Sequence, residues 1–213
     1  MIIKPFVGFK PKKYPDGSVT QWFGENEELY QRAVIINGVP LQGHNGHDYV
    51  APWGTPQLAV EDGVICDVKE DAGGFGMHVR ILAPETMHEW TYGHLSKIRC
   101  QLGQKVKVGD IIGNMGNTGF VVSTTYANKF WGKSPETMFP GTHVHFGLRQ
   151  MRLNPNGWKY AGYKNRVEVL NYDNGYFGAI DPTPYLSIPE KTDWSTPENF
   201  ARLLEFIRLV FRR

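Results

Sequence analysis

The chain has 213 residues, 41% of them hydrophobic and 13% aromatic, which is enough to fill the core of one globular domain. Its net charge of +2 and isoelectric point near 8.4 exclude the strongly basic surface that is typical of nucleic-acid-binding proteins. No stretch has the length of an apolar transmembrane helix and residues 1–13 carry no segment of signal-peptide type, so we expect a protein without a Sec export signal that is soluble or at most surface-associated.

Short strands dominate the pattern along the chain. Residues 1–18 are rich in Pro and Lys and form a predicted N-terminal extension, which ends in a turn signal before a first strand at 19–23. Runs rich in Val, Ile and Tyr then alternate with Gly or Asp turns, and predict strands at 57–60, 63–70, 76–82, 89–95, 105–108 and 111–113. This rhythm predicts a mainly β domain over residues 19–188, with antiparallel strands that close into a sandwich or a small barrel.

The second half of the chain departs from this rhythm. Residues 120–141 are predicted as a long loop inserted into the domain. Turn signals at 154–157 and 173–175 predict two hairpins between Tyr-rich strands. The last segment, 189–213, has an apolar stripe opposite charged residues and predicts an amphipathic α-helix, which packs on the domain, on a partner or second copy, or on a membrane surface.

The cysteine content excludes a disulfide-stapled scaffold, because Cys66 and Cys100 are the only two. Two buried thiols are favoured, and a single bridge between them stays an alternative. Neither cysteine has a second Cys or His at the spacing of a thiolate metal site. The redox compartment therefore stays open.

Histidines supply the first chemical signal, since four of the seven fall into two arrangements that suit a metal ion: HNGHD at 44–48 and HVH at 143–145. In a strand, His143 and His145 project from the same face into one space. The glycines in and before the first arrangement argue against a helix, so we expect a loop that carries His44 to the same ion as Asp48, at the start of a strand. Taken singly, each arrangement is equally compatible with polar residues in a turn or a strand.

Two imidazoles and one carboxylate make the three-ligand set of a catalytic zinc, which leaves a fourth position for water. Imidazole ligands disfavour Ca²⁺ and Mg²⁺, so Zn²⁺ is the expected ion. His94 lies at the end of a predicted strand, where a structural histidine is also ordinary. The remaining histidines, His47, His78 and His88, are assigned no catalytic role and are expected to be solvated or packing residues.

In their order along the chain, these motifs resemble those of the M23 family, the zinc metallopeptidases of LytM or lysostaphin type that cut peptidoglycan peptides. The motifs are HxGxD at 44–48, YGHL at 92–95, GDxIG at 109–113, GxTG at 116–119 and HxHF at 143–146. The resemblance covers residues 22–149, and DPxxYL at 181–186 resembles the closing strand of the family. It implies the family fold, a small antiparallel β core of the duplicated-hybrid-motif type with a cleft across its sheet.

The resemblance also implies roles for five residues. His44, Asp48 and His145 would hold one zinc ion, and His94 and His143 would be the two cleft histidines that do not bind it. Zinc makes water nucleophilic near neutral pH. His143 would accept the proton of that water and pass it to the leaving amine, and His94 would donate a hydrogen bond to the oxyanion. The sequence does not decide which of the two histidines is the main base.

Two departures from the family pattern concern the substrate. The family runs quickly from GxTG to HxH, whereas residues 120–141 intervene here, and Gly147 stands where an acidic residue is common. Tyr126, Phe130 and Trp131 of this insertion form one wall of the cleft and contact the substrate or, alternatively, pack among themselves. The sequence therefore leaves open which peptide bond, and which type of peptidoglycan, is cut.

The expected function is zinc-dependent hydrolysis of cross-bridge or stem-peptide bonds in bacterial peptidoglycan. A noncatalytic binding or regulatory module on the same scaffold is one alternative, against which the intact set of five residues weighs, and a structural component of a phage particle is another. Without an export signal or a separate wall-binding domain, the chain resembles a phage or prophage product. We expect such a product to be made in the cytoplasm and to act on the cell wall after lysis or delivery in a virion.

Overall fold

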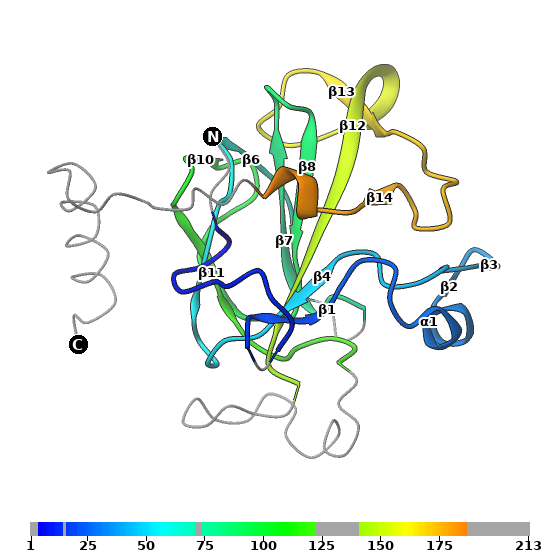
Figure 1. Cartoon of the computed structure of the whole chain (residues 1–213). Coiled ribbons are helices and arrows are strands. Elements are labelled where there is room, and N and C mark those ends of the chain that lie inside the picture. The colour runs from blue at the N-terminus through cyan, green and yellow to red at the C-terminus, as the bar shows by residue number, and fades with distance from the viewer. Residues whose placement is uncertain (1–3, 15, 71–73, 122–140, 187–213) are drawn as a thin grey trace, which may run out of the picture.

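Antiparallel strands form most of the structure, a computed structural model that describes residues 4–14, 16–70, 74–121 and 141–186 (Figure 1). One sheet has nine strands, in the order β1-β4-β12-β8-β7-β6-β10, and β13 and β14 both pair with β12 beside this path. The strands of this sheet are β1 Val19–Gln21, β4 His47–Tyr49, β6 Gly63–Glu70, β7 Met77–Ala83, β8 His88–Tyr92, β10 Lys105–Val106, β12 Val144–Lys159, β13 Arg166–Val169 and β14 Ala179–Ile180. The mainly β, antiparallel fold was predicted.

Two smaller sheets and two short helices complete the described part of the chain. The elements are the three-stranded sheet β5 Pro56–Leu58, β11 Ile111–Met115 and β9 Leu95–Ile98, the hairpin β2 Ile35–Ile36 and β3 Val39–Pro40, α1 Glu27–Ala33, and the 3-10 helix η1 Thr183–Tyr185. Figure 1 shows α1 and the β2–β3 hairpin together at one side of the sheet. None of the described helices has the length and apolar character needed to cross a membrane.

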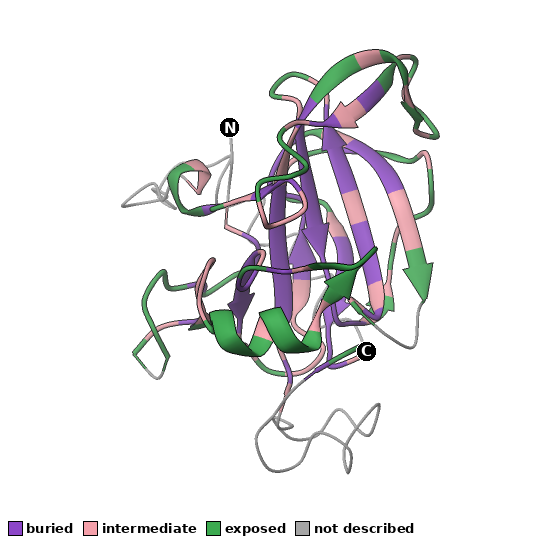
Figure 2. Cartoon of the chain, turned by 90° about the vertical axis from the view of Figure 1, so that its right-hand side faces the viewer, coloured by how far each residue is buried: buried purple, intermediate pink, exposed green. Residues whose placement is uncertain are grey.

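The main core lies between the nine-stranded and the three-stranded sheet, as a sandwich requires. Phe146 and Trp90 stack on each other in it, with 5.1 Å between ring centroids. Leu95 and Ile112 enter the same cluster from the three-stranded sheet. The strands at the centre of the large sheet are therefore buried, whereas α1 has no buried residue (Figure 2). Burial of apolar area of this kind is the dominant favourable contribution to folding.

The alternation of side chains along β12 separates the core from the functional face. Val144, Phe146 and Leu148 belong to the main core, and the residues that alternate with them project from the opposite face of the sheet. Those residues, His145, Gly147 and Arg149, line a groove on that face. Strand β12 thus anchors itself in the core while it presents polar groups to that groove.

Both cysteines are free thiols, as favoured, but only Cys66 is buried and Cys100 is partly exposed. Cys66 is buried in a second, smaller apolar cluster together with Leu82 and Met151. Burial raises the pKa of the Cys100 thiol to about 11, and that of Cys66 is raised further by the same cause. At neutral pH both cysteines are therefore protonated packing residues.

The two predicted hairpin turns were wrong. Strand β12 continues through residues 154–157, because Leu153 and Trp158 both lie opposite Val167 of β13 and the four residues between them bulge out. Residues 173–175 lie between β13 and β14, but these strands pair with β12 and not with each other. Turn-forming residues thus mark a bulge and a longer connection here.

Other differences concern helices and one strand break. Helix α1 was not predicted, and the predicted strand at 89–95 is divided into β8 and β9. The break falls beside His94, whose φ of 59° places it in the left-handed region. Strand β6 has the predicted bounds. The predicted C-terminal helix at 189–213 lies outside the described residues.

Candidate metal centre

Two neighbouring strands bring the predicted ligands together. Asp48 on β4 and His145 on β12 lie directly opposite each other in the antiparallel ladder. His44 precedes β4 in a segment whose backbone forms hydrogen bonds with Gly24 and Glu25. The fold therefore brings His44 next to His145, although 101 positions of sequence separate the two.

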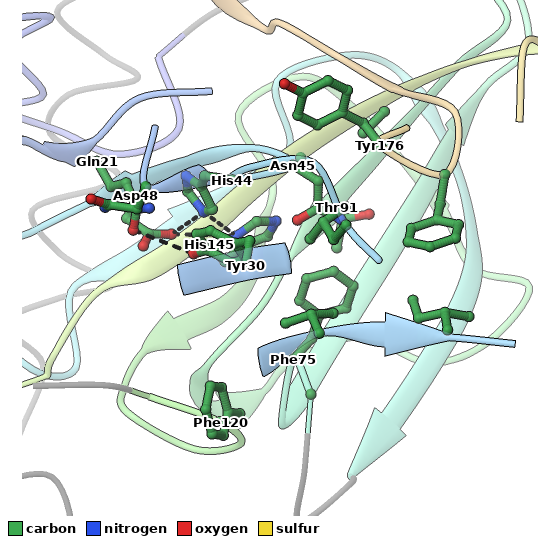
Figure 3. A pocket seen from close by; sticks show the side chains of 18 of the residues that line it. Gln21, Tyr30, His44, Asn45, Asp48, Phe75, Thr91, Phe120, His145 and Tyr176 are labelled. Atoms are coloured by element: carbon green, nitrogen blue, oxygen red, sulfur yellow. Dashed lines mark hydrogen bonds and ion pairs between the residues drawn. The ribbon is translucent and has the colours of Figure 1, made fainter. Parts of the chain in front are cut away.

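Three side-chain atoms form a small triangle at this place (Figure 3). His44 Nε2 lies 3.0 Å from His145 Nδ1 and 3.1 Å from Asp48 Oδ1, and the third side measures 3.3 Å. Tetrahedral zinc ligands, at about 2.0–2.2 Å from the ion, lie roughly 3.3 Å apart. The Oδ1 atom is buried and has no hydrogen-bond partner among the described residues. The donor set therefore fits a zinc ion with one further coordination position.

Neighbouring groups hold the His44 ring in the orientation that a ligand needs. Its Nδ1 donates a hydrogen bond to the backbone oxygen of Trp22 at 3.2 Å, which leaves Nε2 as the free nitrogen within the triangle. The ring of Tyr30, from α1, stacks on the imidazole with 5.5 Å between centroids. Helix α1 thus contributes a residue to the centre that the sequence did not reveal.

The local electrostatics favour the protonation states that a metal requires. Burial raises the pKa of Asp48, but the charges of His44 and His143 and the close contact with His145 outweigh it and hold that pKa well below the usual range. Burial is the main cause that lowers the pKa of His145 to about 4. The centre therefore combines an ionised carboxylate with a neutral imidazole, as metal ligands must be.

The other two predicted histidines border the triangle. The rings of His94 and His143 lie 4.6 Å apart, and His143 Nε2 lies 3.6 Å from Asp48 Oδ2. Each donates its Nδ1 proton to a backbone oxygen, His94 to Thr118 at 2.7 Å and His143 to Gly141 at 2.8 Å. The Nε2 atoms of both rings are therefore acceptors. Burial, followed by the charges of the neighbouring histidines, lowers the pKa of His94 well below its usual value.

The histidines that were predicted to have no catalytic role lie outside this cluster. His47 contacts the Tyr49 hydroxyl at 2.7 Å and Asp181 at 3.0 Å, and His88 contacts Glu61 at 2.8 Å. His78 donates to the backbone oxygen of Gly76. All three are buried, as packing histidines are, and the absence of a catalytic role stays a prediction.

A groove of about 580 Å³ runs from the triangle across the sheet. His94, His143 and the three proposed ligands line one end of it. Further lining residues that the sequence did not single out are Gln21, Leu29, Tyr30, Phe75, Arg80, Thr91 and Tyr176. They come from six separate segments, so no local motif marks them. Tyr126, Phe130 and Trp131, the predicted contacts with the substrate, lie outside the described residues.

Comparison with known proteins gives the family. Residues 42–160, more than half of the chain, match the profile of peptidase family M23. The chain belongs to peptidase family M23. All five residues of the predicted set lie inside the matched segment. Family M23 is zinc-dependent in general, in agreement with the donor set described above.

Individual relatives match parts of this family member. Glycyl-glycine endopeptidase ALE-1 of Staphylococcus capitis is 31% identical over 183 residues, which cover 81% of this chain and 46% of that protein. Lysostaphin of Staphylococcus simulans is 31% identical over 47% of this chain and 20% of its own length. The chain thus spans less than half the length of these relatives. The solved catalytic domain of that lysostaphin aligns with 25% identity and a TM-score of 0.46, over 72% of this chain and 84% of the other.

Proposed function

We propose that the protein is a zinc-dependent endopeptidase that hydrolyses peptide bonds in bacterial peptidoglycan. The observation that carries the proposal is the convergence of three ligand atoms, at 3.0–3.3 Å from one another, beside two histidines with acceptor nitrogens. Such a set leaves room for water and substrate, whereas a structural zinc site is closed by a fourth protein ligand. Family membership makes peptide hydrolysis the expected reaction.

His44, Asp48 and His145 would hold the ion. When bound, zinc supplies Lewis acidity that polarises a peptide carbonyl and makes water nucleophilic near neutral pH. The Nε2 atom of His143 is free to accept the proton of the attacking water, because its Nδ1 proton is engaged with a backbone oxygen. Once protonated, the ring can return that proton to the leaving amine.

His94 shares this work through its short distance to His143. Two imidazolium rings with centroids 4.6 Å apart would repel each other. Only one of the two rings therefore carries an additional proton, at Nε2, at any time. Whichever ring carries it is a hydrogen-bond donor for the negative oxygen of the tetrahedral intermediate. The pair therefore combines the roles of base, acid and oxyanion donor.

A noncatalytic binding module is the second candidate function. Binding by such a module would require only the groove. The ligand triangle and the histidine pair would have no part in it. The completeness of both sets argues against this candidate, because buried imidazoles that face one another carry a desolvation cost that binding alone does not explain.

Digestion of purified sacculi tests the proposal. Relatives of the chain include a glycyl-glycine endopeptidase and a peptidoglycan DD-endopeptidase, so digestion should be tried on sacculi with glycine bridges and on sacculi with direct crosslinks. We expect the zinc-loaded protein to release new amino termini from at least one of them. The new termini identify the bond that is cut.

Asp48→Asn is the matched control, because it keeps the size of the side chain and removes its charge. We expect this variant to bind little zinc and to release no new termini. Retained binding of sacculi without cleavage of any type by the zinc-loaded wild type would favour the noncatalytic module.

A further inference from the structure

The floor of the groove beside the metal centre is a row of residues on three neighbouring strands. Thr91 on β8 pairs with Gly147 on β12 and with Arg80 on β7, so the three lie side by side across the sheet. They line the same groove as His145. In Figure 3, Asp48, His145 and Thr91 follow one another in this direction. The row of Gly147, Thr91 and Arg80 therefore lies directly beside the proposed ligand His145.

Gly147 keeps this floor open. A Cβ atom at this position would lie 3.4 Å from His145 Nε2, 3.5 Å from the Cβ of Thr91 and 3.6 Å from the backbone oxygen of Asn45. These are ordinary contacts, and Gly147 does not have a positive φ, so neither sterics nor backbone strain demands a glycine. What the glycine provides is space above the floor, next to the Nε2 atom of His145.

Two buried donors at this space have no hydrogen-bond partner among the described residues: His145 Nε2 and Arg80 Nε. His145 is only 3% exposed, and its Nδ1 faces the other ligand atoms, so the ring proton resides on Nε2. The second nitrogen of a metal-bound histidine nearly always donates to a carboxylate, a carbonyl or water. Here the described residues supply no such acceptor.

Arg80 lies on the same side of the groove. Its guanidinium is 5.9 Å from the centre of the Phe75 ring, and that ring lies 4.7 Å from the ring of His145. Asp67 on β6 forms an ion pair with Arg80 Nη1 at 3.6 Å, a distance too long for a hydrogen bond. Arg149, the other cation in the lining, is instead hydrogen-bonded to Glu89. Of the two arginines in the described lining, Arg80 is thus the one whose Nε has no hydrogen-bond partner and can bind a ligand.

We propose that His145 Nε2, the Thr91 hydroxyl and the Arg80 guanidinium form a carboxylate subsite above Gly147. This inference rests on the proposed function and names its substrate class: stem peptides that carry a free carboxylate near the cleaved bond, and not runs of glycine. The only carboxylate among the described lining residues is Asp48, which faces the ligand triangle. Asp67 continues the row on β6, but it is not among the lining residues and its ion pair is with Nη1, so a substrate carboxylate would compete with it for Nη1 and would meet Nε without a partner. Charge-assisted hydrogen bonds of this kind are roughly twice as strong as neutral ones.

The subsite fixes the position of the carboxylate in the peptide. If His145 Nδ1 holds the ion, the imidazole ring and one ligand bond would separate Nε2 from it, and the substrate would add a further hydrogen bond. An extended peptide covers about 3.3–3.6 Å per residue, so the carboxylate belongs to a residue about two positions from the cleaved bond.

Matched peptides test the proposal. Each pair consists of two peptides that differ only in a carboxylate or a carboxamide at a residue one or two positions from the scissile bond. One set is hydrolysable, and the other has a reduced methylene-amine bond in place of the scissile amide, so that the Kd is measured by calorimetry on the zinc-loaded protein without turnover. We expect the carboxylate form of at least one pair to bind about tenfold or more tightly and to have a correspondingly higher kcat/KM.

Three variants report on the subsite. Arg80→Gln should bring the ratio of the two Kd values close to one. Gly147→Asp should reverse the preference, because it puts a carboxylate into the subsite, whereas Gly147→Asn has the same size and should retain a preference. Arg152→Gln is the control for loss of an arginine, since Arg152 pairs with Glu168 outside the groove and should leave the ratio unchanged.

The outcomes separate this inference from the proposed function. Tighter binding of the carboxylate analogue that depends on Arg80, without cleavage of any peptide, would support the subsite and contradict the endopeptidase. Cleavage of both members of every pair with equal Kd and equal kcat/KM would overturn the subsite and leave the endopeptidase standing. Equal effects of Asp and Asn at position 147 would also overturn it, because only size would then matter.

Discussion

Gly46 shows how one residue without a side chain controls the metal centre. A Cβ atom at this position would lie 2.7 Å from Cε1 and Nε2 of His145 and 2.7 Å from the backbone oxygen of Phe146. Real Cβ contacts are not that short, and neither the proposed ligand nor the strand that carries it can give way easily. The glycine in HxGxD is therefore a steric requirement of the site.

We predict that Gly46→Ala displaces the His145 ring and weakens zinc binding. Overpacking of this kind costs about 1–3 kcal/mol, so the zinc Kd should rise by about tenfold or more. Zinc content per chain after dialysis against a weak chelator measures the effect. Gly147→Ala is the control, because its Cβ would make only ordinary contacts. Equal zinc retention by the two variants would contradict the steric argument.

The two cleft histidines should behave differently from the ligands. His94→Ala and His143→Ala are each expected to retain zinc, because neither ring belongs to the 3.0–3.3 Å triangle. Each should lower kcat by about 10²–10⁴-fold, the usual contribution of a positioned acid or base. Zinc analysis together with peptide hydrolysis checks both statements. If one of these variants loses zinc as Asp48→Asn does, the histidine that it replaces would have to be assigned as a ligand.

Among single residues, the sequence predicted the clustered histidines and their aspartate, and it missed the common polar residues that line the groove. His44, Asp48, His94, His143 and His145 could be found because imidazoles at short spacing are uncommon and occur in family order. Arg80 and Thr91 could not, because they meet only through the register of β7 with β8 and of β8 with β12. Strand register is a tertiary property that no local pattern contains.

Local sequence determined the strands better than it determined the turns and the helix. Residues 63–70 predict β6 correctly because Val64, Ile65 and Val68 have strong β propensity and the run lies between turn signals. Helix α1 has seven residues, too few for a periodic pattern, and Asn26 at its N-cap makes no side-chain hydrogen bond with it. The turn signal at 154–157 misled because Gly157 serves a close approach: a Cβ there would lie 2.3 Å from the Val167 oxygen of β13.

Glu61 links the segment between β5 and β6 to strand β8. Its buried carboxylate accepts hydrogen bonds from Trp90 Nε1 at 2.5 Å and His88 Nδ1 at 2.8 Å. Burial raises the pKa of Glu61, but these two hydrogen bonds outweigh burial and lower it below its ordinary value. Because the folded-state pKa is the lower one, the ionised group stabilises the fold above its unfolded-state pKa of about 4.3. That contribution is lost as the pH falls through the folded-state pKa.

We therefore predict that Glu61→Gln lowers the free energy of unfolding by about 1–3 kcal/mol at pH 7. The difference from the wild type should shrink as the pH falls from 5 to 3, because the wild type then loses its ionised carboxylate as well. Urea unfolding at several pH values measures both quantities. The exposed Glu85→Gln is the control and should change neither. A Glu61→Gln difference that is constant from pH 7 to pH 3 would contradict the argument.

At the scale of the whole molecule, the core and the metal centre occupy opposite faces of the same strands. Phe6 and Phe9 of the N-terminal extension are buried against Tyr49, with 4.6 Å between the rings of Phe9 and Tyr49. Tyr49 is the neighbour of Asp48 on β4 and projects to the other face. The extension, which was predicted only as a Pro/Lys-rich segment, thus supports the strand that carries a proposed ligand.

This arrangement makes zinc binding a property of the folded chain, since the ligands come from two segments about a hundred positions apart. An ion that binds only the folded state at roughly 100 times its Kd stabilises it by about 2.7 kcal/mol. For a domain of this size, about 2–4 °C per kcal/mol predicts a rise in Tm of roughly 5–11 °C when zinc is added to metal-free protein. Calorimetric scans with and without zinc measure this shift, and Asp48→Asn should show little of it. A rise of the same size in that variant would mean that zinc stabilises the fold elsewhere than at the triangle.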